Sequence, residues 1–119
     1  MSNESEVRQF LNEFHQKLQV FEIIFRDERG KNKKTLIKLE IAPADRKKII
    51  ENLRMEDYCE GPLEDTLYKI GSLWVFGVEV KKEEIYIKIS IGLPNYGVIC
   101  ISFHISERPL AYPFKKMKT

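Results

Sequence analysis

The segment IYIKISI, residues 85–91, carries the pattern from which the fold can be worked out. Successive side chains of a β-strand point to opposite faces of a sheet. The four isoleucines therefore share one face, and Tyr86, Lys88 and Ser90 share the other. We expect the isoleucine face to be buried in the core. What the face with the tyrosine and the lysine contacts is the question that bears on function.

Two similar runs flank this segment, LWVFGVEV at 73–80 and YGVICISFHI at 96–105. They are separated from the central run, 84–91, by KKE at 81–83 and by GLPN at 92–95. Glycine, proline and asparagine are residues that form tight reversals. The three runs and their separators therefore predict an antiparallel meander of three strands in the second half of the chain.

The first half of the chain begins with a predicted helix. Residues 5–18 place apolar side chains on one face at helical spacing, and Ser2, Asn3 and Ser5 are available to cap the first turn. The run VFEIIF at 20–25 is rich in β-branched and aromatic residues, and it predicts a strand after this helix.

Two more helices are expected before the meander. The run KKTLIKLEI at 33–41 fits either a short helix or a strand, and we favour a helix capped by Asn32. Pro43 and Asp45 predict the start of the next helix, because proline suits the first helical position and an acid suits the first turn. This helix is expected to end near Arg54.

The segment between the helices and the meander, residues 55–71, has two glycines, a proline and five acidic residues. This composition predicts a long surface loop with room for one turn of helix. The chain of 119 residues has no internal repeat and no low-complexity tract. We therefore expect a single domain, residues 1–119, of the α+β class, in which N-terminal helices pack on a small antiparallel sheet.

Composition limits the classes of function. The formal net charge of +2 gives little support to a nucleic-acid partner. Cys59 and Cys100 form no CxxC motif, so neither a disulfide framework nor a zinc signature is expected, and a reducing, cytoplasmic setting fits best. No apolar run is long enough to span a membrane, and no phosphate-binding loop, dinucleotide fingerprint, nucleophile elbow or HExxH motif is present. We expect no metal and no other cofactor.

The last predicted strand alternates in the same way as the central one. Its odd-numbered positions from 99 to 105 are apolar and are expected to face the core. The other face is then expected to carry Tyr96, Val98, Cys100, Ser102 and His104. If the two strands pair as a hairpin with both apolar faces inward, Ser102 and His104 lie beside the polar face of residues 85–91. Opposite residues in such a ladder have Cβ atoms about 4.5–5.5 Å apart, which is close enough to surround one phosphate or carboxylate.

The side chains on this face include an acid, a base and a cation. Histidine side chains change charge near neutral pH, so His104 can donate or accept a proton. Lys88 can stabilise negative charge, and Tyr86 can donate a hydrogen bond. The alternative is that the face is merely solvated, because antiparallel sheets commonly expose one polar face to water.

Four short motifs accompany this order of elements. They are Asp57-Tyr58, Leu73-Trp74, Ile85-Tyr86-Ile87-Lys88-Ile89 and Ser102-Phe103. In these motifs and in the order of its elements, from about residue 33 to residue 104, the chain resembles the MqsR toxins of the RelE-like family of bacterial mRNA interferases.

The resemblance implies a RelE-like fold and a metal-independent ribonuclease, in which an RNA 2′-hydroxyl attacks its neighbouring phosphate. It also implies a cognate antitoxin protein as partner. By position, the strand tyrosine of the family falls on Tyr86, and its basic residue after the Ser-Phe pair falls on His104. Two positions depart from the pattern, because a lysine of the family is replaced here by Cys59 and a glutamine by Val75.

Two groups of residues are expected to carry this function. The catalytic group is Tyr86, Lys88 and His104, and the substrate-binding group, which would hold the phosphates of mRNA, is Arg26, Arg29 and Lys31. The alternative function is a non-catalytic protein-binding module that presents a sheet face or edge to a partner protein. The two departures and the modest net charge favour the alternative, whereas the shared face of the catalytic group favours the enzyme.

Overall fold

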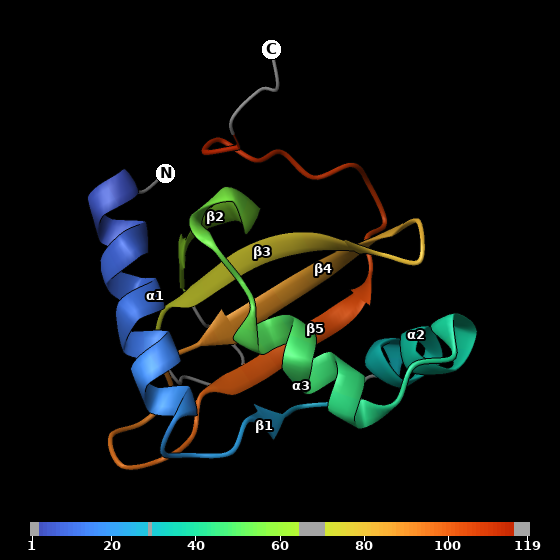
Figure 1. Cartoon of the computed structure of the whole chain (residues 1–119), viewed down its shortest axis with the longest axis horizontal. Helices are drawn as coiled ribbons and strands as arrows, with labels where there is room; N and C mark the ends of the chain where they lie inside the picture. The colour runs from blue at the N-terminus through green and yellow to red at the C-terminus, as the bar shows by residue number, and fades with distance from the viewer. Residues whose placement is uncertain (1–2, 29, 65–70, 116–119) are drawn as a thin grey trace.

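The computed structural model describes residues 3–28, 30–64 and 71–115 (Figure 1). The described elements, in chain order, are α1 (Glu4–Leu18), β1 (Ile24–Phe25), α2 (Lys31–Leu39), α3 (Pro43–Glu51), the 3-10 helix η1 (Met55–Asp57), β2 (Tyr58–Leu63), β3 (Leu73–Val80), β4 (Glu83–Ser90) and β5 (Ile99–Ile105). The predicted α+β class, with N-terminal helices packed on a sheet, is confirmed.

The first helix begins as its sequence predicts. The Asn3 side chain accepts a hydrogen bond from the backbone N–H of Glu6 at 2.9 Å, and the Glu6 carboxylate accepts one from the Asn3 N–H at 3.5 Å, which completes a capping box. The apolar stripe of α1 packs on the sheet, where the rings of Phe10 and Trp74 stack with their centroids 4.6 Å apart. The cap and the aromatic contact together explain where α1 begins and which way it faces.

The third helix also begins where expected, at Pro43, and the Asp45 carboxylate accepts a hydrogen bond from the Ala42 N–H at 2.8 Å. It ends at Glu51, however, rather than near Arg54. The run at 33–41, which fits either a helix or a strand, lies largely within the helix α2, as we favour.

The start of α2 differs from the expectation. Its N-cap is Gly30, which adopts a left-handed conformation with φ of 80°, and Asn32 lies inside the first turn. Glycine tolerates this conformation because it has no Cβ atom. The prediction that Asn32 caps the helix is therefore wrong, and its side chain is free to bond to the sheet instead.

Side chains of α2 close part of the edge of β5. The Asn32 amide donates to the carbonyl of Ile101 at 3.1 Å and accepts from the N–H of Phe103 at 2.9 Å. The Thr35 hydroxyl accepts from the N–H of Ile105 at 3.0 Å. These bonds take the place of a neighbouring strand along this part of β5.

The predicted meander is confirmed, because β3, β4 and β5 are consecutive antiparallel neighbours. Two strands extend it to the order β1-β5-β4-β3-β2. β1 pairs with β5 in parallel, so the sheet is mixed rather than purely antiparallel. The strand expected at 20–25 is reduced to Ile24–Phe25.

The predicted surface loop at 55–71 contains the expected turn of helix, η1, but it is wrong for residues 58–63. These residues form β2, in which the fully buried ring of Tyr58 packs edge-on against Phe76 with centroids 6.0 Å apart. The glycine and the proline that suggested a loop lie within β2, whose pairing with β3 is interrupted by register shifts. Residues 65–70 of the predicted loop lie outside the described residues.

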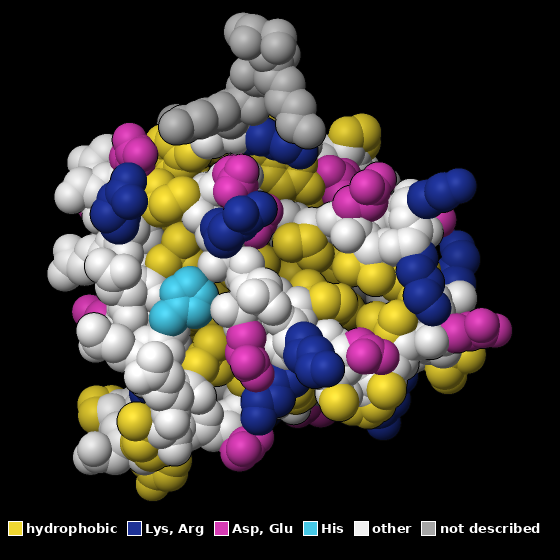
Figure 2. Space-filling model, in the orientation of Figure 1, with side chains coloured by type: hydrophobic (Ala, Val, Ile, Leu, Met, Phe, Trp, Pro, Cys, Tyr) yellow, Lys and Arg dark blue, Asp and Glu magenta, His cyan; other side chains and the backbone are white. Residues whose placement is uncertain are grey.

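The two faces of the sheet have different coverings. The helices α1 and α3 cover one face (Figure 1), where the alternate isoleucines Ile85, Ile87 and Ile89 are fully buried as predicted. Figure 2 shows the molecule from this side, with basic and acidic side chains interspersed on its surface. We call the opposite side the second face; it carries Tyr86 and His104.

Candidate active site

The pairing of β4 with β5 brings the expected catalytic side chains together on the second face. Tyr86 lies directly opposite His104, and the two rings are stacked with centroids 5.3 Å apart and planes 20° apart. Lys88 lies opposite Ser102, and the Lys88 Nζ is 5.6 Å from the centroid of the Tyr86 ring. All four side chains are partly exposed.

A β-bulge in β5 reverses the side of the sheet to which the side chains before Ser102 point. Lys88 pairs with Ser102, but Ile89 pairs with Cys100 rather than with Ile101. One extra residue in a strand reverses the alternation of its side chains. Cys100 is therefore buried in the core, and Ile101 lies outside the core cluster. The predictions that Val98 and Cys100 face outward and that Ile101 faces the core are wrong.

The hydrogen bond of His104 determines which ring nitrogen is available for chemistry. Its Nδ1 lies 3.0 Å from the carbonyl oxygen of Ile105. A carbonyl oxygen can only accept a hydrogen bond, so Nδ1 carries the proton of the neutral ring and Nε2 carries the lone pair. In this tautomer the Nε2 of His104 can act as a general base.

Tyr86 is a protonated phenol at neutral pH. Burial raises its pKa, the carboxylate of Glu60 acts in the same direction, and the charge of Arg108 acts against both. The hydroxyl can therefore donate a hydrogen bond or a proton. Arg108 is a cation near the site that the sequence pattern did not reveal, because it follows β5 outside any periodic segment.

Small and apolar residues of β3 border the catalytic group. Val75 pairs with Lys88 and is fully buried, and Gly77 pairs with Tyr86. A Cβ atom at Gly77 would lie 2.4 Å from the Tyr112 hydroxyl, because the chain after β5 crosses the sheet there. We call residues 106–115 the tail. It covers the second face on the β3 side of Tyr86.

Cys59, the second position that departs from the family pattern, supplies no cation. Burial and the carboxylates of Glu84 and Glu60 raise the pKa of its thiol to about 12. The thiol is therefore neutral at physiological pH, and it is neither an activated nucleophile nor a replacement for a lysine.

The expected substrate-binding cations are engaged with carboxylates. Arg26 forms an ion pair with Glu28 at 2.9 Å. Lys31 forms an ion pair with Glu107, and this hydrogen bond lowers the pKa of the Glu107 carboxyl. A positive charge on the His104 ring acts in the same direction, so the Glu107 carboxylate lies near both Lys31 and His104. Arg29 lies outside the described residues.

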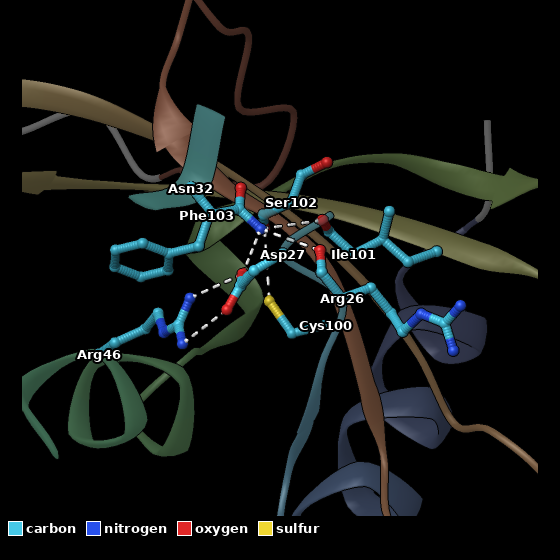
Figure 3. A network of polar contacts seen from close by, with 8 residues as sticks. All are labelled: Arg26, Asp27, Asn32, Arg46, Cys100, Ile101, Ser102 and Phe103. Atoms are coloured by element: carbon cyan, nitrogen blue, oxygen red, sulfur yellow. Dashed lines mark hydrogen bonds and ion pairs between the residues drawn. The ribbon is translucent and has the colours of Figure 1, made fainter. Parts of the chain in front are cut away.

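A largely buried polar network of Asp27, Asn32 and Arg46 joins the segment after β1 to α2 and α3 (Figure 3). The Asp27 carboxylate accepts hydrogen bonds from both terminal nitrogens of Arg46, at 3.1 and 3.3 Å, and from the Asn32 amide at 2.8 Å. The guanidinium of Arg46 is buried and lies 3.6 Å from the centroid of the Phe25 ring. In Figure 3 the side chain of Arg26 points away from this network.

Sequence reasoning missed this network, although one signal was present. Position 46 is the first of the series 46, 49, 50 and 53, whose other members are Ile49, Ile50 and Leu53. A charged residue in the apolar stripe of a helix requires a buried partner. The sequence therefore indicates a partner for Arg46, but it does not indicate Asp27.

Among residues 3–28, 30–64 and 71–115, no group of three or more His, Cys, Asp and Glu side chains is arranged to hold a metal ion. No helix within these residues has both the length and the apolar character needed to cross a membrane. Comparison of the chain with models of known protein families, with curated proteins and with solved structures finds no match. Its function is therefore inferred from the geometry of the second face.

Proposed function

We propose that this chain is a metal-independent endoribonuclease that cleaves mRNA, the toxin of a toxin–antitoxin pair, as its resemblance to the MqsR toxins of the RelE-like family implies. The single observation that supports this proposal best is the stacked pair of Tyr86 and His104 with Lys88 beside it. The three side chains offer a proton donor, a proton acceptor and a positive charge on one exposed face.

In the proposed reaction, Nε2 of His104 takes the proton of an RNA 2′-hydroxyl, and the 2′-oxygen forms a bond to the adjacent phosphorus. The bond between phosphorus and the 5′-oxygen of the next nucleotide breaks, which leaves a 2′,3′-cyclic phosphate. The hydroxyl of Tyr86 gives its proton to the departing 5′-oxygen. Lys88 stabilises the negative charge that develops on the phosphoryl oxygens.

Arg26, Arg29 and Lys31 bind the phosphates of the substrate in this proposal. The carboxylates of Glu28 and Glu107 occupy two of these cations in the free protein. RNA phosphates exchange with these carboxylates, so binding weakens as the salt concentration rises. The enzyme acts on mRNA in the cytoplasm, where a cognate antitoxin protein holds it inactive.

A second candidate function, a non-catalytic protein-binding module that presents a sheet face or edge, is favoured by a specific observation. The buried side chain of Val75 lies opposite Lys88, and the neutral thiol of Cys59 stands where the resembling family has a lysine. Both changes remove polar groups from the neighbourhood of the catalytic side chains.

RNA cleavage in the presence of a metal chelator tests the proposal. We expect the wild-type protein to cut mRNA and to leave 2′,3′-cyclic phosphate ends. His104→Ala and Tyr86→Phe should each reduce the rate by about 100-fold or more, which is the usual contribution of a general acid or base. His15→Ala, the same substitution at the histidine on α1, is the matched control and should cleave at the wild-type rate.

Circular dichroism of each variant shows whether it is folded. A folded wild-type protein that neither cuts RNA nor slows growth when expressed rules out the enzyme and leaves the binding module. Equal cleavage by the wild type and His104→Ala overturns the assignment of the base.

A further inference from the structure

The outer edge of β1 is suited to pairing with another strand. At the opposite edge of the sheet, β2 carries Glu60 and Pro62 and pairs irregularly with β3, and such features discourage strand addition. The edge of β5 beyond β1 is closed by Asn32 and Thr35 of α2. Figure 1 shows β1 at the border of the sheet with no element beyond it in the part of the chain that the structure describes.

The hydrogen bonds of β1 to β5 determine which of its backbone groups point outward. Ile24 and Arg26 donate their N–H groups to carbonyl oxygens within residues 98–100, both at 2.9 Å. Ile24 of β1 and Arg26 just after it therefore direct their backbone groups toward β5. The odd-numbered residues Ile23 and Phe25 direct theirs outward, where a further strand would meet them.

The surface beside this edge is apolar. The exposed fraction is 39% for Ile24, 74% for Val20, 51% for Leu93 and 60% for Tyr96. Figure 2 shows exposed apolar side chains at its lower left, where Figure 1 places the end of α1 and the β4–β5 connection. Contiguous exposed apolar surface is typical of a protein interaction site.

Contacts within the chain place these apolar residues next to β1. The Lys17 ammonium, near the end of α1, donates to the carbonyl of Leu93 at 2.8 Å. Gly97 packs against the carbonyl of Glu22 and near the side chain of Ile24. The end of α1, the β4–β5 connection and β1 therefore form one continuous surface.

We propose that β1 pairs with β1 of a second copy of this chain, antiparallel about a two-fold axis at Ile24. In this register the outward N–H and C=O groups of Ile23 bond to those of Phe25 in the other copy, and the reverse pair forms as well. Ile24 of each copy faces Ile24 of the other. Glu22 of each copy lies opposite Arg26 of the other, so that two pairs of opposite charge form.

The charges of Glu22 and Arg26, which flank β1, favour this register over its neighbours. A two-fold axis at Ile23 would place Glu22 opposite Ile24, and an axis at Phe25 would place Ile24 opposite Arg26. Only the axis at Ile24, among these three, matches acid with base and isoleucine with isoleucine. A patch that is complementary to itself in this way fits a second copy, which presents the same residues in reverse order.

The charged residues on either side of β1 form ion pairs within the chain. Glu22 is paired with Lys47 at 3.2 Å, and Arg26 is paired with Glu28 at 2.9 Å. Both pairs lie at the surface, where an ion pair contributes little to stability. The short strand supplies few backbone bonds, so we expect a weak dimer with a Kd on the order of 10⁻⁵ M.

Sedimentation velocity over a range of concentrations that brackets this Kd tests the proposal. Glu22→Arg and Arg26→Glu should each weaken the dimer about tenfold or more, because each places two pairs of like charge across the axis. The double variant with both substitutions should restore association to within a few-fold of the wild type. Ile24→Lys should also prevent association, whereas Ile37→Lys, at an isoleucine on α2 that is 77% exposed, is the matched control and should not.

A wild-type chain that stays monomeric over the whole range overturns the proposal. A double variant that associates as weakly as the single variants overturns the register. The inference does not rest on the proposed RNA cleavage. Sedimentation is measured without RNA. The dimer can therefore be absent while RNA is cleaved, or present while RNA is not cleaved.

Discussion

At the scale of single residues, the buried network depends on the carboxylate of Asp27. Partial burial would by itself raise the pKa of Asp27, but the hydrogen bonds from Arg46 and Asn32 and the charge of Arg46 outweigh it, and the pKa lies below its usual value. A carboxyl with a lowered pKa stabilises the fold at pH values above its unfolded pKa of about 3.9. This contribution is lost as the pH falls through the lower folded pKa.

We therefore expect Asp27→Asn to lower the free energy of unfolding at pH 7 by about 3 kcal/mol, because Arg46 remains charged and buried without its partner. Urea denaturation at pH 7 and at a series of lower pH values measures this difference, which should shrink below about pH 4 as the wild-type carboxyl is protonated. Asp45→Asn, at an exposed position in α3, is the control and should cost about 1 kcal/mol or less. A variant as stable as the wild type at pH 7 would show that the ion pair contributes nothing.

The shared face of Tyr86, Lys88 and His104 could be predicted from the sequence because the side chains of a strand alternate. Tyr86 and His104 follow this alternation, and their strands are joined by a recognisable turn. The burial of Cys100 could not be predicted, because it depends on a single extra residue in β5. A bulge of this kind is set by the pairing of two strands, which the sequence of one strand does not specify.

At the scale of elements, α2 stabilises the sheet by taking the place of a strand along β5. Asn32→Asp keeps the size of the side chain and the acceptor for Phe103, but it replaces the donating amide group by an oxygen that faces Asp27 and the carbonyl of Ile101. We expect this change to lower the free energy of unfolding by about 3 kcal/mol, since it removes donors from buried acceptors and adds a like charge.

Urea denaturation of Asn32→Asp and of a matched variant, Asn52→Asp, measures this effect. The exposed amide of Asn52 donates only to the carbonyl of Lys48, at 2.7 Å, among the contacts of the described residues. Its replacement should cost about 1 kcal/mol or less. Equal losses in the two variants would contradict the role assigned to α2.

The elements differ in how far their sequences determine them. The starts of α1 and α3 could be predicted, because Asn3 and Pro43 act through contacts with their own first turns. The start of α2 and the strand β2 could not be predicted, because both depend on distant contacts. Asn32 bonds to β5 rather than capping its own helix, and Gly61 and Pro62 sit in a strand that pairs with β3 through register shifts.

At the scale of the whole molecule, the tail, residues 106–115, packs back onto the sheet. The Glu84 carboxylate accepts hydrogen bonds from the Tyr112 hydroxyl at 2.7 Å and from the Leu110 N–H at 2.9 Å. Burial and this hydrogen bond raise the pKa of Tyr112. Farther along, the ring of Phe114 stacks on Tyr58 with centroids 5.4 Å apart. The Glu84 carboxylate therefore helps to hold the tail on the sheet beside the proposed catalytic group.

We expect Glu84→Gln to release the tail while the sheet stays folded, because the hydrogen bonds to a charged acceptor contribute about 1.5–3 kcal/mol and local segments can open independently of the core. Amide hydrogen exchange at Leu110 measures this opening and should accelerate about tenfold or more, since 1.4 kcal/mol corresponds to a factor of ten. The amide of Ile87, in the middle of β4, should keep the wild-type exchange rate. Glu83→Gln removes the same charge from the adjacent residue and is the control. Wild-type exchange at Leu110 in Glu84→Gln would mean that the apolar contacts of the tail, rather than this carboxylate, keep it on the sheet.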